Sequence, residues 1–213
     1  MSAFTLSAKP GTDIWSKPST LTFNAPTKQP SSVTHTGPIK AFKSARVSVS
    51  FPWSQQYDQA GLILGFRKTT LTLAARAPQR WIKTGVEFYN GEPLLSTVGT
   101  DNFSDWSVAP HPDGEKAVGA STWTTISFEK VESETGPSIW VYLIRADGKK
   151  QPLREVTWCF GNDAENWNVG IAAYVARPNK DGAEPLEAQF KDLEVTFESF
   201  KQDIWYDEET QPE

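Results

Sequence analysis

The sequence predicts an all-β protein, either a β-sandwich or a jelly roll. Short stretches rich in β-branched and aromatic residues recur along the chain and are separated by Gly, Pro, Asn and Asp. No stretch shows apolar residues at the three- and four-residue spacing of an amphipathic helix. The chain also carries 12 Phe, 9 Trp and 5 Tyr in 213 residues. Because aromatic side chains pack well on pleated surfaces, these observations together favour sheets.

Eight stretches have the composition of strands. In chain order they are residues 45–51, 59–66, 81–89, 123–131, 139–145, 155–160, 168–176 and 190–197. The clearest turn between them is Asp147-Gly148, because Asp-Gly adopts the positive φ of a tight hairpin turn at little cost. It predicts that the strand 139–145 pairs with a strand that restarts near Leu153. Residues 139–145 are apolar on both faces, so the sequence leaves open which face points toward a groove.

We expect one domain over residues 1–213, because no linker or internal repeat divides the chain and sandwiches reach this length. Residues 1–38 differ from the rest, since five prolines interrupt short β-prone pieces. We expect this segment to wrap an edge or an end of the sandwich. Residues 201–213 carry many of the acidic side chains and are predicted to form a solvated tail.

Charge and cysteine usage restrict the partners and the compartment. The formal net charge is −5 and no cluster of Lys and Arg is present, which disfavours nucleic acid as a partner. The first 18 residues show neither a basic region nor a sustained apolar region of the kind that signal peptides carry, and no run approaches the roughly 20 apolar residues that cross a bilayer. We therefore expect neither secretion nor a membrane partner. Cys159 is the single cysteine and is expected to be a small buried hydrophobe. These features favour a cytoplasmic protein, while a monomer and a homodimer stay equally open.

Four short motifs resemble, in the same order, those of one family. They are YDQAGL at 57–62, WIKTGVE at 81–87, DWS at 105–107, and REV at 154–156 followed by VGIAA at 169–173. The chain thus resembles a concanavalin A-like family of unknown function that includes the fungal regulation-of-enolase proteins and C-terminal modules of some family 43 glycoside hydrolases. The resemblance covers roughly residues 39–197. It implies two curved antiparallel sheets with a concave face and a role in carbon metabolism, but no ligand, because such folds serve many functions.

Residues 81–89 alternate between two kinds of side chain. If this segment is a strand, residues two apart share a face. Ile82, Val86 and Phe88 are then expected to face the core, while Trp81, Lys83, Glu87 and Tyr89 face a ligand. Lys83 and Glu87 would lie about 13 Å apart along the strand, so each needs partners from other strands. The full set of residues expected to bind a ligand is Gln59, Trp81, Lys83, Glu87, Tyr89, Asp105, Trp106, Arg145 and Tyr174.

Our leading hypothesis is binding of a small carbohydrate-like or carboxylated ligand on the concave face. A non-hydrolytic isomerase, lyase or cyclase is the first alternative, with Lys83 as a base and Arg145 stabilising an anion. A glycosidase that uses Glu87 and Asp105 is less favoured, because no second inward-facing Glu accompanies them. Two further readings are a regulator that binds a metabolic enzyme, and a plain solvated face on which Lys83 and Glu87 form ion pairs.

Metals and cofactors are not expected. His35 and His111 are the only histidines, and both lie in Pro-rich stretches where we expect them at the surface. Neither has a partner at the spacing of a metal site. The chain also lacks a Gly-rich phosphate loop and a dinucleotide-binding motif.

Overall fold

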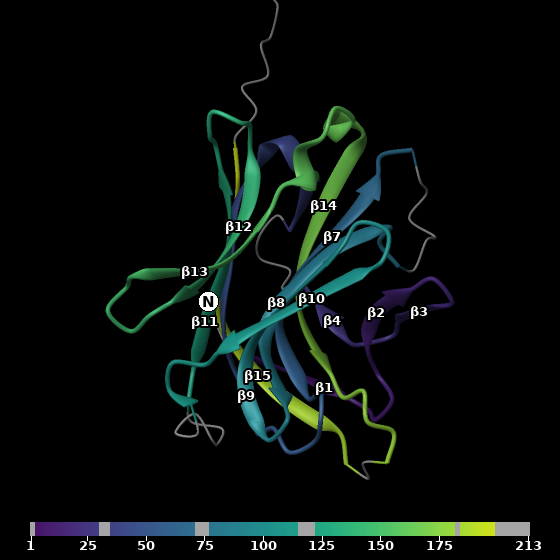
Figure 1. The fold of residues 1–213 in the computed structure, drawn as a ribbon, viewed down its shortest axis with the longest axis vertical. Helices are drawn as coiled ribbons and strands as arrows, with labels where there is room; N and C mark the ends of the chain where they lie inside the picture. Colours follow the sequence, from purple (N-terminus) through teal and green to yellow (C-terminus); the bar gives the residue numbers. More distant parts are fainter. Residues whose placement is uncertain (1–2, 30–34, 71–76, 115–121, 182–183, 199–213) are drawn as a thin grey trace, which may run out of the picture.

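The computed structural model describes residues 3–29, 35–70, 77–114, 122–181 and 184–198. Two antiparallel sheets lie face to face, which confirms the predicted sandwich (Figure 1). The six-stranded sheet has the strand order β1-β15-β6-β11-β12-β13. Its strands are β1 (Phe4–Ala8), β6 (Phe42–Ser50), β11 (Thr124–Val131), β12 (Ser138–Ile144), β13 (Lys150–Val156) and β15 (Leu186–Phe197).

The seven-stranded sheet has the strand order β10-β9-β8-β7-β14-β4, and β5 also pairs with β14. Its strands are β4 (Thr27–Lys28), β5 (Thr36–Pro38), β7 (Gln59–Lys68), β8 (Arg80–Tyr89), β9 (Glu92–Thr100), β10 (Ser104–Pro110) and β14 (Trp167–Ala176). The short helices are η1 (Ile39–Ala41), η3 (Trp158–Phe160) and η4 (Ala164–Asn166). In the described ranges, no helix is long and apolar enough to cross a membrane.

The main core lies between the two sheets and contains one face of β8. Ile82 and Val86 are buried there, as their alternation predicts. Leu62 and Leu64 of β7 join them from the neighbouring strand. Since successive side chains of a strand point to opposite faces, Lys83 and Glu87 lie on the outer face of the same sheet.

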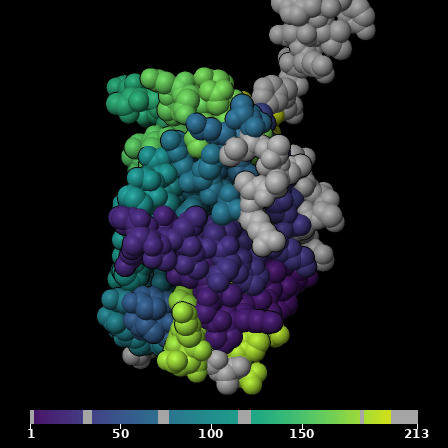
Figure 2. Space-filling model, turned by 90° about the vertical axis from the view of Figure 1, so that its right-hand side faces the viewer, coloured from purple at the N-terminus to yellow at the C-terminus, as the bar shows by residue number. Residues whose placement is uncertain are grey.

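A separate two-stranded hairpin covers part of this outer face. It is formed by β2 (Ile14–Lys17) and β3 (Thr20–Phe23), which pair with each other. The hairpin lies beside the seven-stranded sheet in Figure 1, and in Figure 2 the N-terminal residues form a purple band across the molecule. Ahead of the hairpin, β1 pairs with β15 at the edge of the six-stranded sheet. The N-terminal segment therefore contacts both sheets. The predicted acidic tail at 201–213 lies outside the described residues.

Two expectations about strands need correction. The strand predicted at 155–160 ends at Val156, and Trp158–Phe160 form a 3-10 turn instead. The hairpin predicted at Asp147-Gly148 is present, but its second strand begins at Lys150. Strands β9 and β10 have no counterpart among the predicted elements. Residues 95–100 of β9 are all buried, so the strand lacks the alternation that marks a half-exposed one.

Both histidines are buried, so the expectation that they lie at the surface is wrong. The Nε2 atom of His111 lies 2.9 Å from Oγ1 of Thr124, and the carbonyl oxygen of His35 accepts a hydrogen bond from the backbone N–H of Ile171. The two side chains are thus buried although described neighbours such as Pro38, Pro110 and Pro112 are exposed. Cys159 is buried as expected, and burial raises the pKa of its thiol.

Candidate functional site

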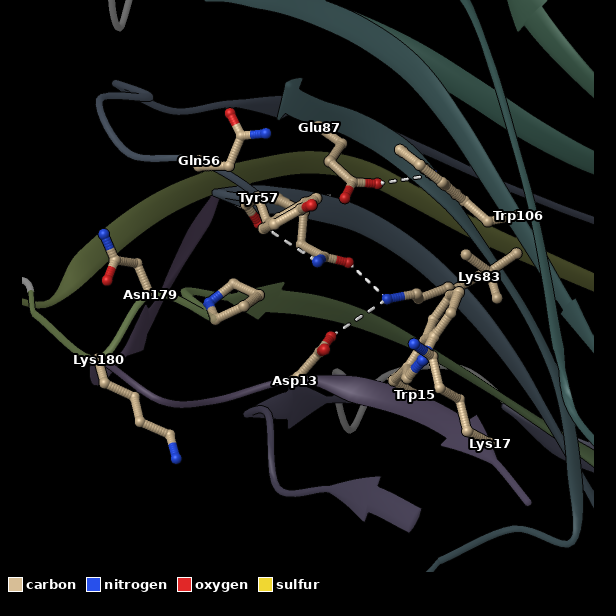
Figure 3. A pocket seen from close by; sticks show the side chains of 13 residues that line it. Asp13, Trp15, Lys17, Gln56, Tyr57, Lys83, Glu87, Trp106, Asn179 and Lys180 are labelled. Carbon is tan, nitrogen blue, oxygen red and sulfur yellow. Dashed lines mark hydrogen bonds and ion pairs between the residues drawn. The ribbon is translucent and has the colours of Figure 1, made fainter. Parts of the chain in front are cut away.

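A cavity of about 650 Å³ opens on the outer face of the seven-stranded sheet (Figure 3). Four segments that are far apart in the sequence contribute to it. Its lining residues are Asp13, Trp15 and Lys17 from the start of the hairpin, Gln56 and Tyr57 from the loop before β7, Gln59, Lys83, Glu87, Val98 and Trp106 from the sheet, and Pro178, Asn179 and Lys180 from the segment after β14.

The register of β7 and β8 sets the floor of the cavity. Gln59 of β7 lies opposite Glu87 of β8 in the ladder. Lys83 is on the same face of β8 as Glu87, and Gly85 lies between them. Gly85 lies opposite Gly61, so no side chain projects between Lys83 and Glu87 at that point. A Cβ atom on either glycine would collide with a backbone carbonyl of the neighbouring strand. The two glycines therefore permit the close approach of the strands beneath the site.

The Lys83 ammonium is buried at the base of the cavity. Its Nζ atom donates a 2.6 Å hydrogen bond to Oε1 of Gln59 and lies 3.5 Å from Oδ1 of Asp13. The ring of Tyr174 packs beneath it, with its centroid 5.8 Å from Nζ. Burial lowers the pKa of Lys83, and the carboxylates of Asp13 and Glu87 oppose that shift. An ammonium has three donors, so one stays available beyond these two described contacts.

Glu87 is buried on the same face. Its Oε2 atom accepts hydrogen bonds from Oγ of Ser96 at 2.6 Å and from Nε1 of Trp106 at 3.1 Å. Burial raises the pKa of Glu87, while the positive charge of Lys83 and the hydrogen bond from Ser96 oppose that rise. The site thus holds a carboxyl group and an amine whose pKa values are shifted toward each other. Such pairs are typical of functional sites.

Aromatic rings line one side of the cavity. The Tyr57 ring lies 5.6 Å from that of Tyr89, which in turn meets Trp106 edge-on at 5.0 Å. Tyr57 is 40% exposed and its φ is 69°, in the left-handed region that costs a residue with a side chain about 1–3 kcal/mol. Its N–H bonds the carbonyl of Phe88 and its carbonyl accepts the side-chain amide of Gln59. These bonds hold the exposed ring over the floor.

A buried ion pair anchors the loop that carries Tyr57. Asp58 accepts two 2.8 Å hydrogen bonds from the guanidinium of Arg177, and both side chains are buried. The same carboxylate accepts the backbone N–H groups of Ser54 and Gln55, each at 3.0 Å. Arg177 directly precedes the lining segment 178–180. One ion pair therefore fixes two sides of the cavity.

The N-terminal hairpin supplies the residues that sequence reasoning missed. Asp13, Trp15 and Lys17 line the cavity, and their odd-numbered spacing is the signal that would have placed them on one face. Between them, Ile14 packs into a second apolar cluster against the sheet. Local alternation alone does not indicate that this segment lies over β8, some 70 residues later.

Of the predicted ligand-facing residues, four line the cavity: Gln59, Lys83, Glu87 and Trp106. Tyr89 and Tyr174 pack behind these residues rather than lining the space. Trp81 has the predicted parity, but it is only 2% exposed and lies beneath the hairpin, where Phe23 meets it edge-on at 5.5 Å. The expectation that Trp81 faces a ligand is therefore wrong, because the hairpin covers that end of β8.

Asp105 and Arg145 also lie away from the cavity, contrary to expectation. Asp105 adjoins Trp106 on β10 and so points to the opposite face, where it pairs with Arg154 of the other sheet. Arg145 follows β12 in the six-stranded sheet and donates to the side-chain oxygen of Gln151. The structure thus contradicts both the Glu87–Asp105 pairing of a glycosidase and a role of Arg145 at this site. Among the described residues, no group of three or more metal-ligating side chains occurs.

The family of the chain follows from its sequence as a whole. Residues 1–200 match the family described as a protein of unknown function (DUF1349). The chain belongs to this family. An uncharacterized protein of Emericella nidulans is 41% identical over 196 residues, which is 91% of this chain and 86% of that protein. Regulation of enolase protein 1 of Saccharomyces cerevisiae is 29% identical over 87 residues, 41% of this chain and 37% of that protein.

Solved structures of other proteins share the fold seen here. A functionally unknown protein from Saccharomyces cerevisiae matches with a TM-score of 0.62 at 18% identity, covering 93% of this chain and 89% of that one. Alginate lyase A1-II', a member of polysaccharide lyase family-7, matches with a TM-score of 0.53 at 10% identity, covering 93% and 80%. At these identities the likeness concerns the fold alone. It confirms the concanavalin A-like jelly roll expected from the sequence.

Proposed function

We propose that the cavity binds a small polyhydroxylated, carbohydrate-like ligand. The observation that carries this proposal is the combination of buried polar groups on the floor, Gln59, Lys83 and Glu87, with the exposed ring of Tyr57 beside them. A sugar offers hydroxyl groups to such donors and acceptors and apolar C–H faces to aromatic rings. The volume of about 650 Å³ falls within the roughly 300–1,000 Å³ of small-molecule sites.

Charge favours a neutral sugar over a carboxylated ligand. The buried ammonium of Lys83 already lies 3.5 Å from the carboxylate of Asp13, and the field of Glu87 reaches it as well. A ligand carboxylate would add a further negative group around one buried cation. Lys17 and Lys180 also line the cavity, but both are exposed, so solvent screens their charge. The relative named Regulation of enolase protein 1 supports a role of the ligand in carbon metabolism.

A thermal-shift panel of neutral sugars tests the proposal. Ligand at 100 times its dissociation constant should stabilise the protein by about 2.7 kcal/mol. We expect Lys83→Met to reduce the shift to about half or less, because it removes a donor at the base of the cavity and weakens binding. Lys149→Met is the matched control, since that side chain is 79% exposed. The proposal fails if no sugar raises the melting temperature of the wild type, or if a sugar raises that of Lys83→Met by as much as that of the wild type.

The opposite pKa shifts of Lys83 and Glu87 favour one second candidate, a non-hydrolytic acid–base enzyme. A carboxyl group with a raised pKa can donate a proton, and an amine with a lowered pKa can accept one. Sugars that bind should then be converted, and NMR of the mixture should reveal a product that Glu87→Gln fails to form. Binding without any product would leave the site as a binding site only.

A further inference from the structure

We propose that the cavity receives a free short saccharide or the end of a glycan, and excludes the interior of a polysaccharide chain. This inference rests on the proposed carbohydrate function and specifies its ligand class. The interior of a chain needs a groove with two openings, because the polymer must enter at one and leave at the other. Here two walls that meet at a corner bound two adjoining sides of the cavity, so a chain that runs straight across the floor meets a wall at one end.

The first wall is the N-terminal hairpin, which crosses the outer face of the sheet. At one end, Ile14 joins Tyr174 of β14 in an apolar cluster. Further across, Phe23 packs on Trp81 of β8. At the far side, the backbone N–H of Ser16 donates to Oγ of Ser104 on β10 at 2.9 Å. The hairpin is thus attached across the width of the sheet, and Figure 2 shows the corresponding purple band.

The second wall is the segment after β14, and it is joined to the first by backbone hydrogen bonds. The N–H groups of Gly11 and Thr12 donate to the carbonyl of Arg177 at 2.8 and 3.2 Å. The N–H of Arg177 in turn donates to Oγ1 of Thr12 at 3.0 Å. Figure 3 shows Asn179 and Lys180 of this segment across the cavity from Trp106. These bonds join the two walls at their corner.

These walls are structural parts of the protein. Ile14 is fully buried and Trp81 is 2% exposed, so moving the hairpin would expose the apolar cluster to water. The ion pair with Asp58 fixes Arg177, the residue directly before the second wall. A ligand therefore meets the floor residues with a terminus, and its remaining sugars extend past the exposed ring of Tyr57.

The test compares oligomers of increasing length. Affinities of glucose, cellobiose, cellotriose and cellohexaose, and of the corresponding mannose series, are measured by titration calorimetry. For the series that binds, we expect the dissociation constants of the hexamer and the trimer to agree within about three-fold, because the cavity holds only the terminal sugars of each oligosaccharide. A hexamer that binds more than about three-fold tighter than the trimer overturns the inference while leaving sugar binding intact. Absence of binding by every sugar overturns the proposed function and this inference together.

Variants of the hairpin provide a second readout. Trp15→Ala removes the largest side chain that the hairpin contributes to the cavity, whereas Leu21→Ala alters an exposed residue of the same hairpin. Trp15→Ala should raise the affinity for the hexamer relative to the trimer by more than about three-fold, and Leu21→Ala should leave that ratio unchanged. If the ratio is the same in both variants, the hairpin is not the wall that limits ligand length. Loss of a direct contact with Trp15 would weaken the binding of both oligomers alike, so it would not by itself change the ratio of their affinities.

Discussion

Replacing Arg177 by methionine should destabilise the protein strongly and loosen two sides of the cavity. The substitution removes both 2.8 Å hydrogen bonds to Asp58 and leaves that fully buried carboxylate with two backbone N–H donors. It also removes the 2.6 Å bond from the guanidinium to the carbonyl of Glu184. Removing one partner of a buried ion pair costs about 3–5 kcal/mol. We therefore expect a loss of about that size in the free energy of unfolding.

Urea unfolding measures this loss. With a slope of about 1–3 kcal/mol per molar urea, a loss of about 3–5 kcal/mol should lower the midpoint by about 1–5 M. Arg46→Met is the matched control, because the Arg46–Glu194 pair has a similar 2.8 Å distance but side chains that are 49% and 55% exposed. It should cost less than about 1 kcal/mol. Equal losses in the two variants would refute the argument that burial of the Asp58–Arg177 pair fixes the loops.

Three further predictions concern single residues. Burial raises the pKa of Glu87, so the folded protein keeps a proton that the unfolded chain releases above about pH 4.3. The stability that protonated Glu87 contributes is fully present below that pH and is lost as the pH rises through the pKa of Glu87 in the folded protein. Over that pH range, the free energy of unfolding of Glu87→Gln should therefore rise relative to that of the wild type. Chemical denaturation at several pH values checks this, and a flat difference would contradict it. Gly85→Ala should destabilise by more than about 2 kcal/mol or prevent folding, whereas Gly99→Ala, whose Cβ meets no atom within 4 Å, should change stability by less than about 1 kcal/mol in the same assay. Cys159, buried and with a raised thiol pKa, should react with a thiol reagent only after unfolding, and rapid labelling of the native protein would show the burial to be wrong.

Short-range alternation was sufficient to predict the floor of the cavity. The pattern of residues 81–89 separates Ile82 and Val86 from Lys83 and Glu87, and the structure has these pairs on opposite faces of β8. The same rule shows why Asp105 could not join Trp106 at the site, since adjacent residues of a strand point to opposite faces. Where charged and apolar residues alternate along a strand, the sequence alone thus assigns the direction of a side chain.

Relations between distant segments were not predictable in this way. The apolar strand at 139–145 gives no sign of which sheet it joins, so Arg145 was expected at a site that lies on the other sheet. Trp81 was expected in contact with a ligand because nothing local indicates that the N-terminal hairpin covers it. Asp13 was missed for the same reason. A cytoplasmic location and a single domain stay predictions from the sequence.

The most direct test of a sugar site on this face is a calorimetric titration of the sugar that gives the largest thermal shift. We expect one site per chain in the wild type and in Lys149→Met, and an affinity at least about ten-fold lower in Lys83→Met, because a hydrogen bond to a charged group contributes about 1.5–3 kcal/mol. Tyr57→Ala should weaken binding as well, since it removes an exposed ring beside the floor. Unchanged affinity in both Lys83→Met and Tyr57→Ala would contradict the assignment of the ligand to this cavity.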